Sequence, residues 1–220
     1  TFNSYGIEVV SGIILGLDTD TPRTADHLLR FIEESGIPML TINLLYALPK
    51  TRLYERLQAE GRLIGRPDDE SNVLFKMPQE QVKGMWRRCI AQAYEPEALF
   101  ERFARQIRQT YPHRLGPKGQ RVRLRDLAYA LRVLTRIAWR VGVRADYRGP
   151  FWRTVRPLLR QGRLEELIHI GLVSHHLIRF TRASLAGQAE ACFYADPGRA
   201  QPRAAGAAPV VPLTITPSSG

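Results

Sequence analysis

Two glycines set four positions apart near the amino terminus are the residues of this sequence best placed to admit a ligand. Gly12 and Gly16 interrupt a mostly apolar run, residues 7–17, and a polar loop follows. A short apolar run bounded by turn residues predicts a strand buried on both faces, and glycine within it indicates close approach by a ligand or another backbone. Because side chains alternate along a strand, Ile14 lies between the glycines on one face. We expect that face to be flat, with Ile14 as its apolar floor, and to accept a planar ring.

Polar residues lie near the ends of this strand and of a second predicted strand, residues 39–46. Asp18 and Asp20 follow the first strand, and Asn43 lies within the second. In parallel α/β units, ligands bind at the carboxyl ends of the strands. A buried asparagine needs a hydrogen-bond partner, and a ligand or a structural partner would serve equally well. For the two aspartates, loop solvation or capping of the next helix, by Asp20 or Thr21, is favoured over catalysis.

The elements around these residues predict a parallel strand–helix–strand–helix unit. Residues 24–35 have the apolar spacing of an amphipathic helix, with Pro22 near its start and Gly36 after its end. A short helix, residues 52–60, follows the second strand. Short loops join these elements, so we expect a right-handed crossover. The second half of the sequence predicts helices over residues 79–94, 96–110, 123–141, 151–159 and 163–185.

Histidines and cysteines are the residues here that most often hold metals. His169 and His176 share a helical face at a spacing of seven, and His175 adjoins them. Metal-binding pairs on a helix usually have a spacing of four, so a structural or substrate-lining role is favoured for all three. The two cysteines lie far apart. Cys89 falls on the apolar stripe of its helix and is predicted to be a small buried residue, and Cys192 lies near the carboxyl terminus.

Charge divides the chain into two unequal halves. Residues 1–80 have a net charge of −4, whereas residues 81–220 have a net charge of +15. A basic half favours nucleic acid, an anionic membrane surface or an acidic partner domain. Arg132, Arg136 and Arg140 recur at helical spacing, a pattern most often found on a solvated face. No apolar run reaches the ~18 residues that a membrane span needs.

Several segments together carry a resemblance to a known family. They are GIILG with its polar loop, ALPKTRLYERLQAEGRL, DDESNVLFKMP and WRRCIAQAYEPEALFERF. Over roughly residues 1–195 the chain resembles cobalamin-dependent radical S-adenosylmethionine enzymes. The resemblance implies an α/β fold, the C-terminal part of a radical SAM partial TIM-type barrel followed by an all-α domain. We expect the incomplete barrel over residues 1–75, the helical domain over 76–195 and a disordered tail over 196–220.

The resemblance also implies cofactors. Gly12, Ile14, Gly16 and Asn43 would contact S-adenosylmethionine. The family holds a [4Fe–4S] cluster on a CxxxCxxC motif and binds cobalamin in an upstream domain, and neither cysteine of this chain fits such a motif. We therefore expect a C-terminal piece of a longer enzyme, inactive alone, whose missing partners are the N-terminal barrel half and the cobalamin-binding domain.

The implied reaction is methylation of an unactivated carbon, with a hopanoid lipid as the expected substrate. The basic half would then contact an anionic membrane, and we expect a cytoplasmic protein, peripheral at the inner face of the membrane. An alternative of another class remains, a basic helical module that binds nucleic acid or an acidic partner. Against nucleic acid, the sequence has no recognisable motif of that kind, and its arginines are spread over several helices.

Overall fold

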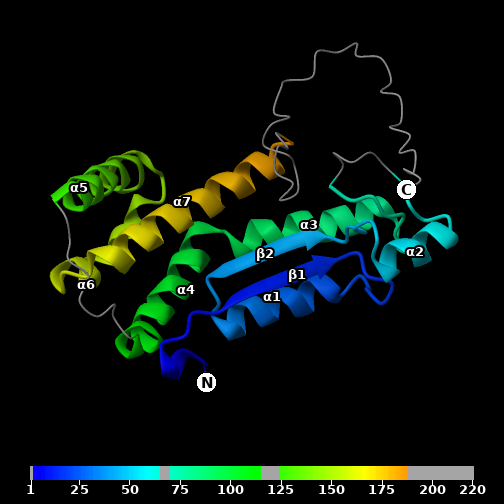
Figure 1. Cartoon of the computed structure of the whole chain (residues 1–220), viewed down its shortest axis with the longest axis horizontal. Helices are drawn as coiled ribbons and strands as arrows, with labels where there is room; N and C mark the ends of the chain where they lie inside the picture. Colours follow the sequence, from blue (N-terminus) through cyan, green and yellow to red (C-terminus); the bar gives the residue numbers. More distant parts are fainter. Residues whose placement is uncertain (1, 65–69, 115–123, 188–220) are drawn as a thin grey trace, which may run out of the picture.

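The structure is a computed structural model that describes residues 2–64, 70–114 and 124–187. Figure 1 shows the order of its elements along the chain. They are η1 (Phe2–Tyr5), β1 (Val10–Leu15), α1 (Thr24–Ser35), β2 (Met39–Leu44), α2 (Arg52–Ala59), α3 (Gln79–Ala93), α4 (Pro96–Gln109), η2 (Tyr111–His113), α5 (Leu124–Trp139), η3 (Arg140–Arg144), α6 (Arg148–Arg160) and α7 (Leu164–Leu185). The predicted tail and Cys192 lie outside the described residues.

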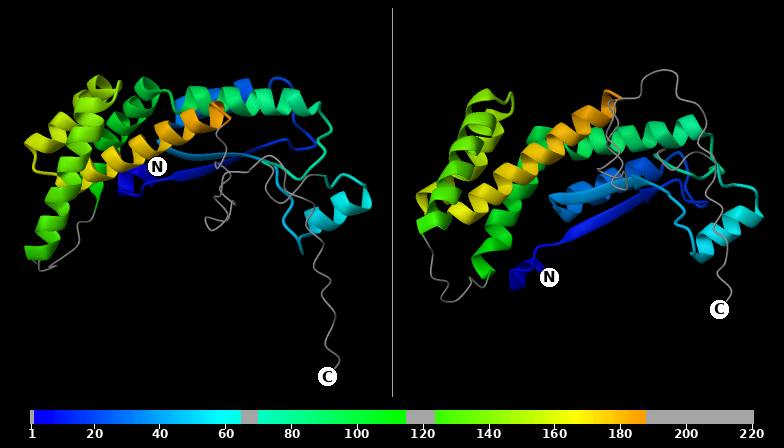
Figure 2. Two further views of the ribbon diagram at one scale, coloured as in Figure 1. Left: turned by 90° about the horizontal axis from the view of Figure 1, so that it is seen from above. Right: turned by 45° about the horizontal axis from the view of Figure 1, so that its top comes forward.

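The sheet has two parallel strands in the described part of the chain, and only one of its faces is covered. Strands β1 and β2 pair in register from Val10 opposite Met39 to Leu15 opposite Leu44. The buried side chains alternate along each strand, and α1 and α3 lie together against that face (Figures 1 and 2). The prediction of strands buried on both faces was wrong for these residues, because the opposite face is open.

Helix α2 is followed by a segment that returns to the sheet. The side chain of Thr51 caps α2, accepting a hydrogen bond from the Tyr54 N–H at 3.2 Å, and Leu57 is fully buried. After α2, Leu63 and Val73 form an isolated antiparallel bridge. This arrangement brings residues 70–76 alongside the carboxyl end of β2.

Helix α3 belongs to the layer that covers the sheet. Its Trp86 Nε1 donates a hydrogen bond to the Ile42 carbonyl at 2.9 Å, and the Tyr94 hydroxyl, just after the helix, donates to the Leu40 carbonyl. The first helix of the predicted helical domain is therefore packed directly on β2. The division of the chain at residue 75 stays a prediction.

The remaining helices form a second packed group. Helix α4 starts at Pro96 and packs on α6 and α7. Its Phe100 meets the ring of Phe151, on α6, edge-on at a centroid distance of 6.1 Å. Helix α6 continues through Pro157 to Arg160, further than the predicted 151–159. Among the described residues the molecule is mostly helical with a small parallel sheet, and a barrel is not formed by them.

No helix in the described part of the chain combines the length and apolar character required to cross a membrane.

Candidate functional site

The open face of the sheet brings three of the four predicted site residues together. Gly12 lies opposite Thr41, and Ile14 lies opposite Asn43. Because side chains alternate along a strand, these two pairs lie on the same face of the sheet. The Ile14 side chain is 50% exposed. A Cβ atom added at Gly12 would meet only the Thr41 hydroxyl, at an ordinary 3.5 Å. The result is a shallow surface with an apolar centre and a polar edge, which suits a planar ring.

Asn43 supplies that polar edge. Its side chain is half-buried, and it makes no hydrogen bond to any other residue that the structure describes. An amide carries two donors and an acceptor, and such groups are normally satisfied when buried. The sequence left two roles open for the Asn43 amide. The described residues offer it no structural hydrogen bond, and contact with a ligand stays a prediction.

Gly16 does not share this face. It lies just after β1 with a φ of +96°, and a Cβ atom there would lie 2.5 Å from the Phe75 ring. The backbone turns at Gly16, so the alternation that places Gly12 and Ile14 on one side ends there. The expectation that Gly16 helps to form the flat face was wrong, because Phe75 fills the space that its missing side chain leaves.

Asp20 holds the turn that follows. Its Oδ2 accepts hydrogen bonds from the N–H groups of Gly16 and Leu17, at 2.7 and 3.0 Å. Helix α1 begins at Thr24 without a side-chain cap, although the Thr24 hydroxyl accepts from the Thr21 N–H at 2.9 Å. Asp20 therefore stabilises a loop, and the expected capping of the helix by Asp20 or Thr21 was wrong.

Three cations lie around Asp18: Arg56 in α2, Arg62 just after α2, and Lys76 further along the chain. Arg62 makes two contacts to its carboxylate, at 2.7 and 3.2 Å, and Arg56 and Lys76 lie 3.4 and 3.6 Å away. The hydrogen bonds from Arg62 hold the pKa of Asp18 below its ordinary value. Arg62 also donates to the Leu74 carbonyl at 2.9 Å. A carboxylate held in this way is a structural clamp, and it is poorly suited to accept a proton.

Two polar side chains fasten the next segment to the end of β2. Asn72 donates to the Ala47 carbonyl at 2.9 Å and accepts from the Ala47 N–H at 2.8 Å. Ser71 donates to the Leu45 carbonyl at 2.6 Å. These side chains satisfy backbone groups just beyond the end of β2. The role of this segment could not be read from spacing, because its partners lie about 25 residues earlier in the chain.

A polar cluster at the opposite end of β1 was missed by the sequence analysis. Glu8 lies 2.7 Å from Arg114 and 3.5 Å from His169, with its side chain 13% exposed. Burial raises the pKa of Glu8, but His169 and Arg114 outweigh it and the net pKa is lowered. Tyr111 is buried beneath the Arg114 guanidinium, 4.6 Å from it. Only the folded chain brings these residues together, so no spacing signalled them.

The other two histidines have separate neighbours. His175 Nδ1 lies 2.6 Å from the Tyr147 hydroxyl, and burial lowers the pKa of His175. His176 stacks on Phe180, with ring centroids 6.3 Å apart. Across residues 2–64, 70–114 and 124–187, no group of three or more His, Cys, Asp or Glu is arranged to hold a metal.

Cys89 is fully buried in α3, and burial raises its pKa to about 11. A thiol in that state is neither a ready ligand nor a ready nucleophile, because both roles need the thiolate.

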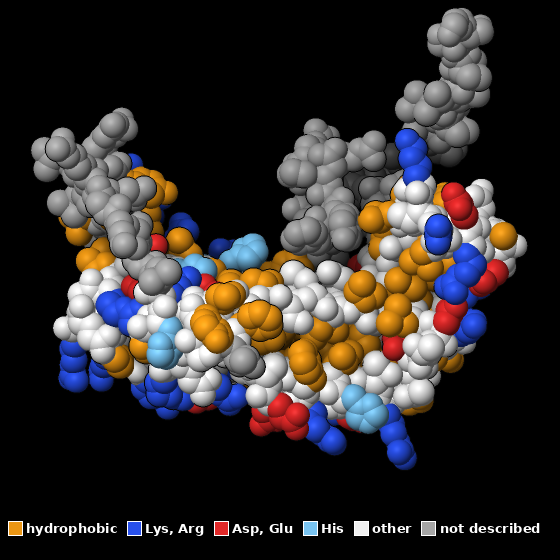
Figure 3. Space-filling view, turned by 60° about the horizontal axis from the view of Figure 1, so that its bottom comes forward, with side chains coloured by type: hydrophobic (Ala, Val, Ile, Leu, Met, Phe, Trp, Pro, Cys, Tyr) orange, Lys and Arg blue, Asp and Glu red, His pale blue; other side chains and the backbone are white. Residues whose placement is uncertain are grey.

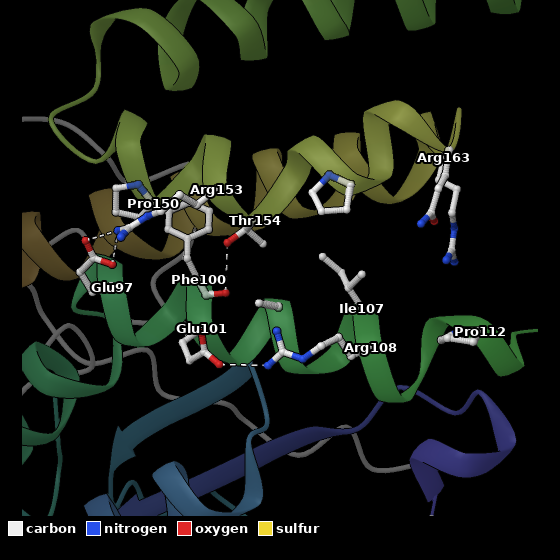
Figure 4. A pocket seen from close by; sticks show the side chains of 13 residues that line it. Glu97, Phe100, Glu101, Ile107, Arg108, Pro112, Pro150, Arg153, Thr154 and Arg163 are labelled. Carbon is white, nitrogen blue, oxygen red and sulfur yellow. Dashed lines mark hydrogen bonds and ion pairs between the residues drawn. The ribbon is translucent and has the colours of Figure 1, made fainter.

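A groove of about 540 Å³ lies between α4 and α6 (Figure 4). Apolar side chains such as Phe100 and Ile107 line it, and the ion pair between Glu97 and Arg153 lies at one end. None of the residues that line the groove lies on β1 or β2, and they form no arrangement typical of catalysis.

Comparison with known proteins shows which family the chain belongs to. Residues 51–190 match a family described as Domain of unknown function (DUF4070). The chain belongs to the DUF4070 family. It is 50% identical over 195 residues to Hopanoid C-2 methylase of Rhodopseudomonas palustris (strain TIE-1), an alignment that covers 88% of this chain and 37% of that protein.

A second relative of this DUF4070 chain is Uncharacterized methyltransferase sll1242 of Synechocystis sp. (strain ATCC 27184 / PCC 6803 / Kazusa). It is 28% identical over 178 residues, covering 78% of this chain and 32% of the relative. The chain thus spans about a third of the length of the curated relatives it matches. No solved structure matches it.

These comparisons confirm the resemblance inferred from the sequence segments. Both relatives are named methyltransferases or methylases, which supports an enzyme parent. The alternative of a basic binding module gains no support from them.

Proposed function

We propose that this chain is the C-terminal part of a cobalamin-dependent radical S-adenosylmethionine methyltransferase that methylates an unactivated carbon of a hopanoid lipid. The observation that carries the proposal is the 50% identity to Hopanoid C-2 methylase along 88% of the chain. Under this proposal β1 and β2 are the last strands of a partial TIM-type barrel.

The exposed surface around β1 supports an incomplete sheet. Each strand pairs on one side only among the described residues, and an unpaired strand edge is usually protected in a finished protein. Figure 3 shows hydrophobic side chains gathered along the middle of this side of the molecule. Exposed hydrophobic residues in the first 17 positions are Phe2, Tyr5, Ile7, Val10, Ile14 and Leu17. A band of this kind marks a binding surface, and we assign it to the missing half of the barrel.

The open face fits the adenosine part of S-adenosylmethionine. Gly12 leaves room for close approach, Ile14 offers an apolar contact for the base, and the Asn43 amide is free to bond to it within the described residues. When bound beside the cluster and cobalamin, this cofactor set supplies hydrogen abstraction by a carbon radical and a transferable methyl group. The part assigned to this chain is to position the adenosine and to keep water from it.

The cysteines of this chain do not fit the [4Fe–4S] cluster. Cys89 is buried with a raised pKa, and Cys192 lies outside the described residues and far away in sequence. Nothing in the described residues marks a cobalamin site. We therefore place both sites in the remainder of the parent enzyme, and we propose that this chain alone is inactive.

We also propose that the parent enzyme is cytoplasmic and peripheral at the inner face of the membrane, where a hopanoid substrate would be met. The net charge of +15 on residues 81–220 supports this placement, because anionic lipid attracts clustered Lys and Arg side chains.

A chimera tests the function directly. The matching segment of Hopanoid C-2 methylase is replaced by this chain, and the chimera is expressed in a hopanoid-producing strain that lacks its own methylase. Mass spectrometry of extracted hopanoids should detect a product heavier by one methylene unit. If the chimera is present in the cell at the level of the unaltered methylase and yields no such product, the proposal is wrong.

A further inference from the structure

The outer face of α5 and η3 exposes apolar side chains that the core does not use. Tyr129, Leu131, Trp139 and Val143 are 70, 64, 58 and 52% exposed. The inner face of α5 is occupied, because Ile137 is buried against α7, at Gly171. Figure 2 shows α5 at the end of the molecule away from the sheet. The exposed residues therefore belong neither to the core nor to the open face of the sheet.

A row of arginines runs beside these apolar side chains. Arg132, Arg136, Arg140 and Arg144 recur every four residues, and all four are exposed. None has a carboxylate partner among the described residues, and residues 128–144 contain no Asp or Glu. Some other arginines of the chain are paired, as Arg182 is with Asp146 at 2.7 Å. The charge on this face is therefore uncompensated.

Helix geometry places the apolar side chains and the arginines on one exposed side of α5. Successive residues are 100° apart around an α-helix, so Leu131 and Trp139 lie about 80° apart, and Arg132 lies within about 20° of Trp139. A helix that lies in a membrane interface has this composition, with apolar and aromatic side chains in the acyl boundary and arginines at the phosphates. Exposed aliphatic side chains such as Leu131 and Val143 would contribute little to binding nucleic acid, which favours lipid as the partner.

We propose that the α5–η3 face is the surface through which the protein binds an anionic lipid bilayer. Trp139, Leu131 and Val143 enter the boundary between headgroups and acyl chains, and the four arginines contact the phosphates. This assignment rests on the membrane contact in the proposed function and names the element that makes it. It requires no methyl transfer, so it can be tested on this chain alone.

The test is binding of the 220-residue chain to vesicles of phosphatidylcholine with and without phosphatidylglycerol. Each arginine near an anionic surface contributes about five-fold to binding, so Arg132→Gln, Arg136→Gln and Arg140→Gln together should weaken it about 100-fold. The matched control replaces Arg30, Arg52 and Arg87, three exposed arginines on α1, α2 and α3, and should change binding only a few-fold. Circular dichroism checks that both variants keep their helices.

Tryptophan emission gives a second readout. Trp139 is well exposed, whereas Trp86 is buried and Trp152 is held by a hydrogen bond to the Gly142 carbonyl. Brominated acyl chains should quench emission of the bound protein, and Trp139→Phe should abolish most of that quenching while binding persists.

Three results would each overturn the proposal. They are no binding to anionic vesicles, equal losses of binding in both triple variants, and quenching that survives Trp139→Phe. Tight binding to a nucleic acid duplex that the Arg132, Arg136 and Arg140 variant loses would also overturn it. Vesicle binding by a chain whose chimera fails to methylate would overturn the proposed function and leave this surface standing.

Discussion

At Gly16 the backbone conformation and a neighbouring ring both exclude a side chain. The φ of +96° disfavours any residue with a Cβ atom, and Phe75 occupies the position that the Cβ would take. Gly12, four residues earlier, has neither constraint. Two glycines that look equivalent in the sequence therefore have different roles, one for packing and one for an open surface.

Gly16→Ala should lower the free energy of unfolding by about 3 kcal/mol, through backbone strain together with displacement of the Phe75 ring. The control is Gly61→Ala, because Gly61 also has a positive φ but has no atom within 4 Å of an added Cβ. We expect about 1 kcal/mol there. Denaturant unfolding measures both values, and equal losses would show that Phe75 does not press on Gly16.

Glu8 should make stability depend on pH. Its pKa is lowered in the folded protein, so its contribution is complete above the unfolded value of about 4.3 and is lost as the pH falls through the folded value. Glu8→Gln should cost about 1–2 kcal/mol at pH 7, and the difference from the wild-type protein should shrink on acidification. The exposed Glu101, paired with Arg108, gives the control Glu101→Gln, for which we expect almost no loss. A Glu8→Gln loss that stays constant from pH 7 to pH 3 contradicts this account.

At the scale of elements, the segment after α2 closes the end of β2. Asn72 bonds to both backbone groups of Ala47, which is fully buried. Asn72→Ala should lower the free energy of unfolding by about 2 kcal/mol, because buried backbone groups lose their partners. Asn43→Ala is the matched control, since the Asn43 amide has no partner among the described residues and its loss should leave stability nearly unchanged. Thermal unfolding compares the two, and a larger loss for Asn43→Ala would show that its amide has a structural role.

Local patterns in the sequence predicted most of the elements. Helix α1, strand β2 and helix α4 follow from apolar spacing and from the residues at their ends. The clamp of Asp18 by Arg62 and the contact of Glu8 with His169 did not follow, because each joins residues more than 40 positions apart. The residues of the open face were predicted in part. Alternation placed Gly12 and Ile14 together, but the ring of Phe75, some 60 residues further on, decided the role of Gly16.

At the scale of the molecule, the account requires cofactor sites that this chain does not contain. Reconstitution of the 220-residue chain with iron and sulfide should give no stoichiometric [4Fe–4S] absorbance, because Cys89 is buried with a raised pKa and no CxxxCxxC motif is present. Unaltered Hopanoid C-2 methylase is the positive control. A full cluster on this chain would refute the proposal that the cluster site lies in the remainder of the parent enzyme.

The most direct test of the central claim is methyl transfer by the chimera carrying Gly12→Val. Valine suits a strand, and its Cβ would meet only Thr41 at 3.5 Å, so the substitution should leave folding intact while obstructing the adenosine face. Gly84→Val, on an open part of α3, is the control. We predict that methylated hopanoid falls at least ten-fold with Gly12→Val and is unchanged with Gly84→Val. Full methylation by the Gly12→Val chimera would contradict the account.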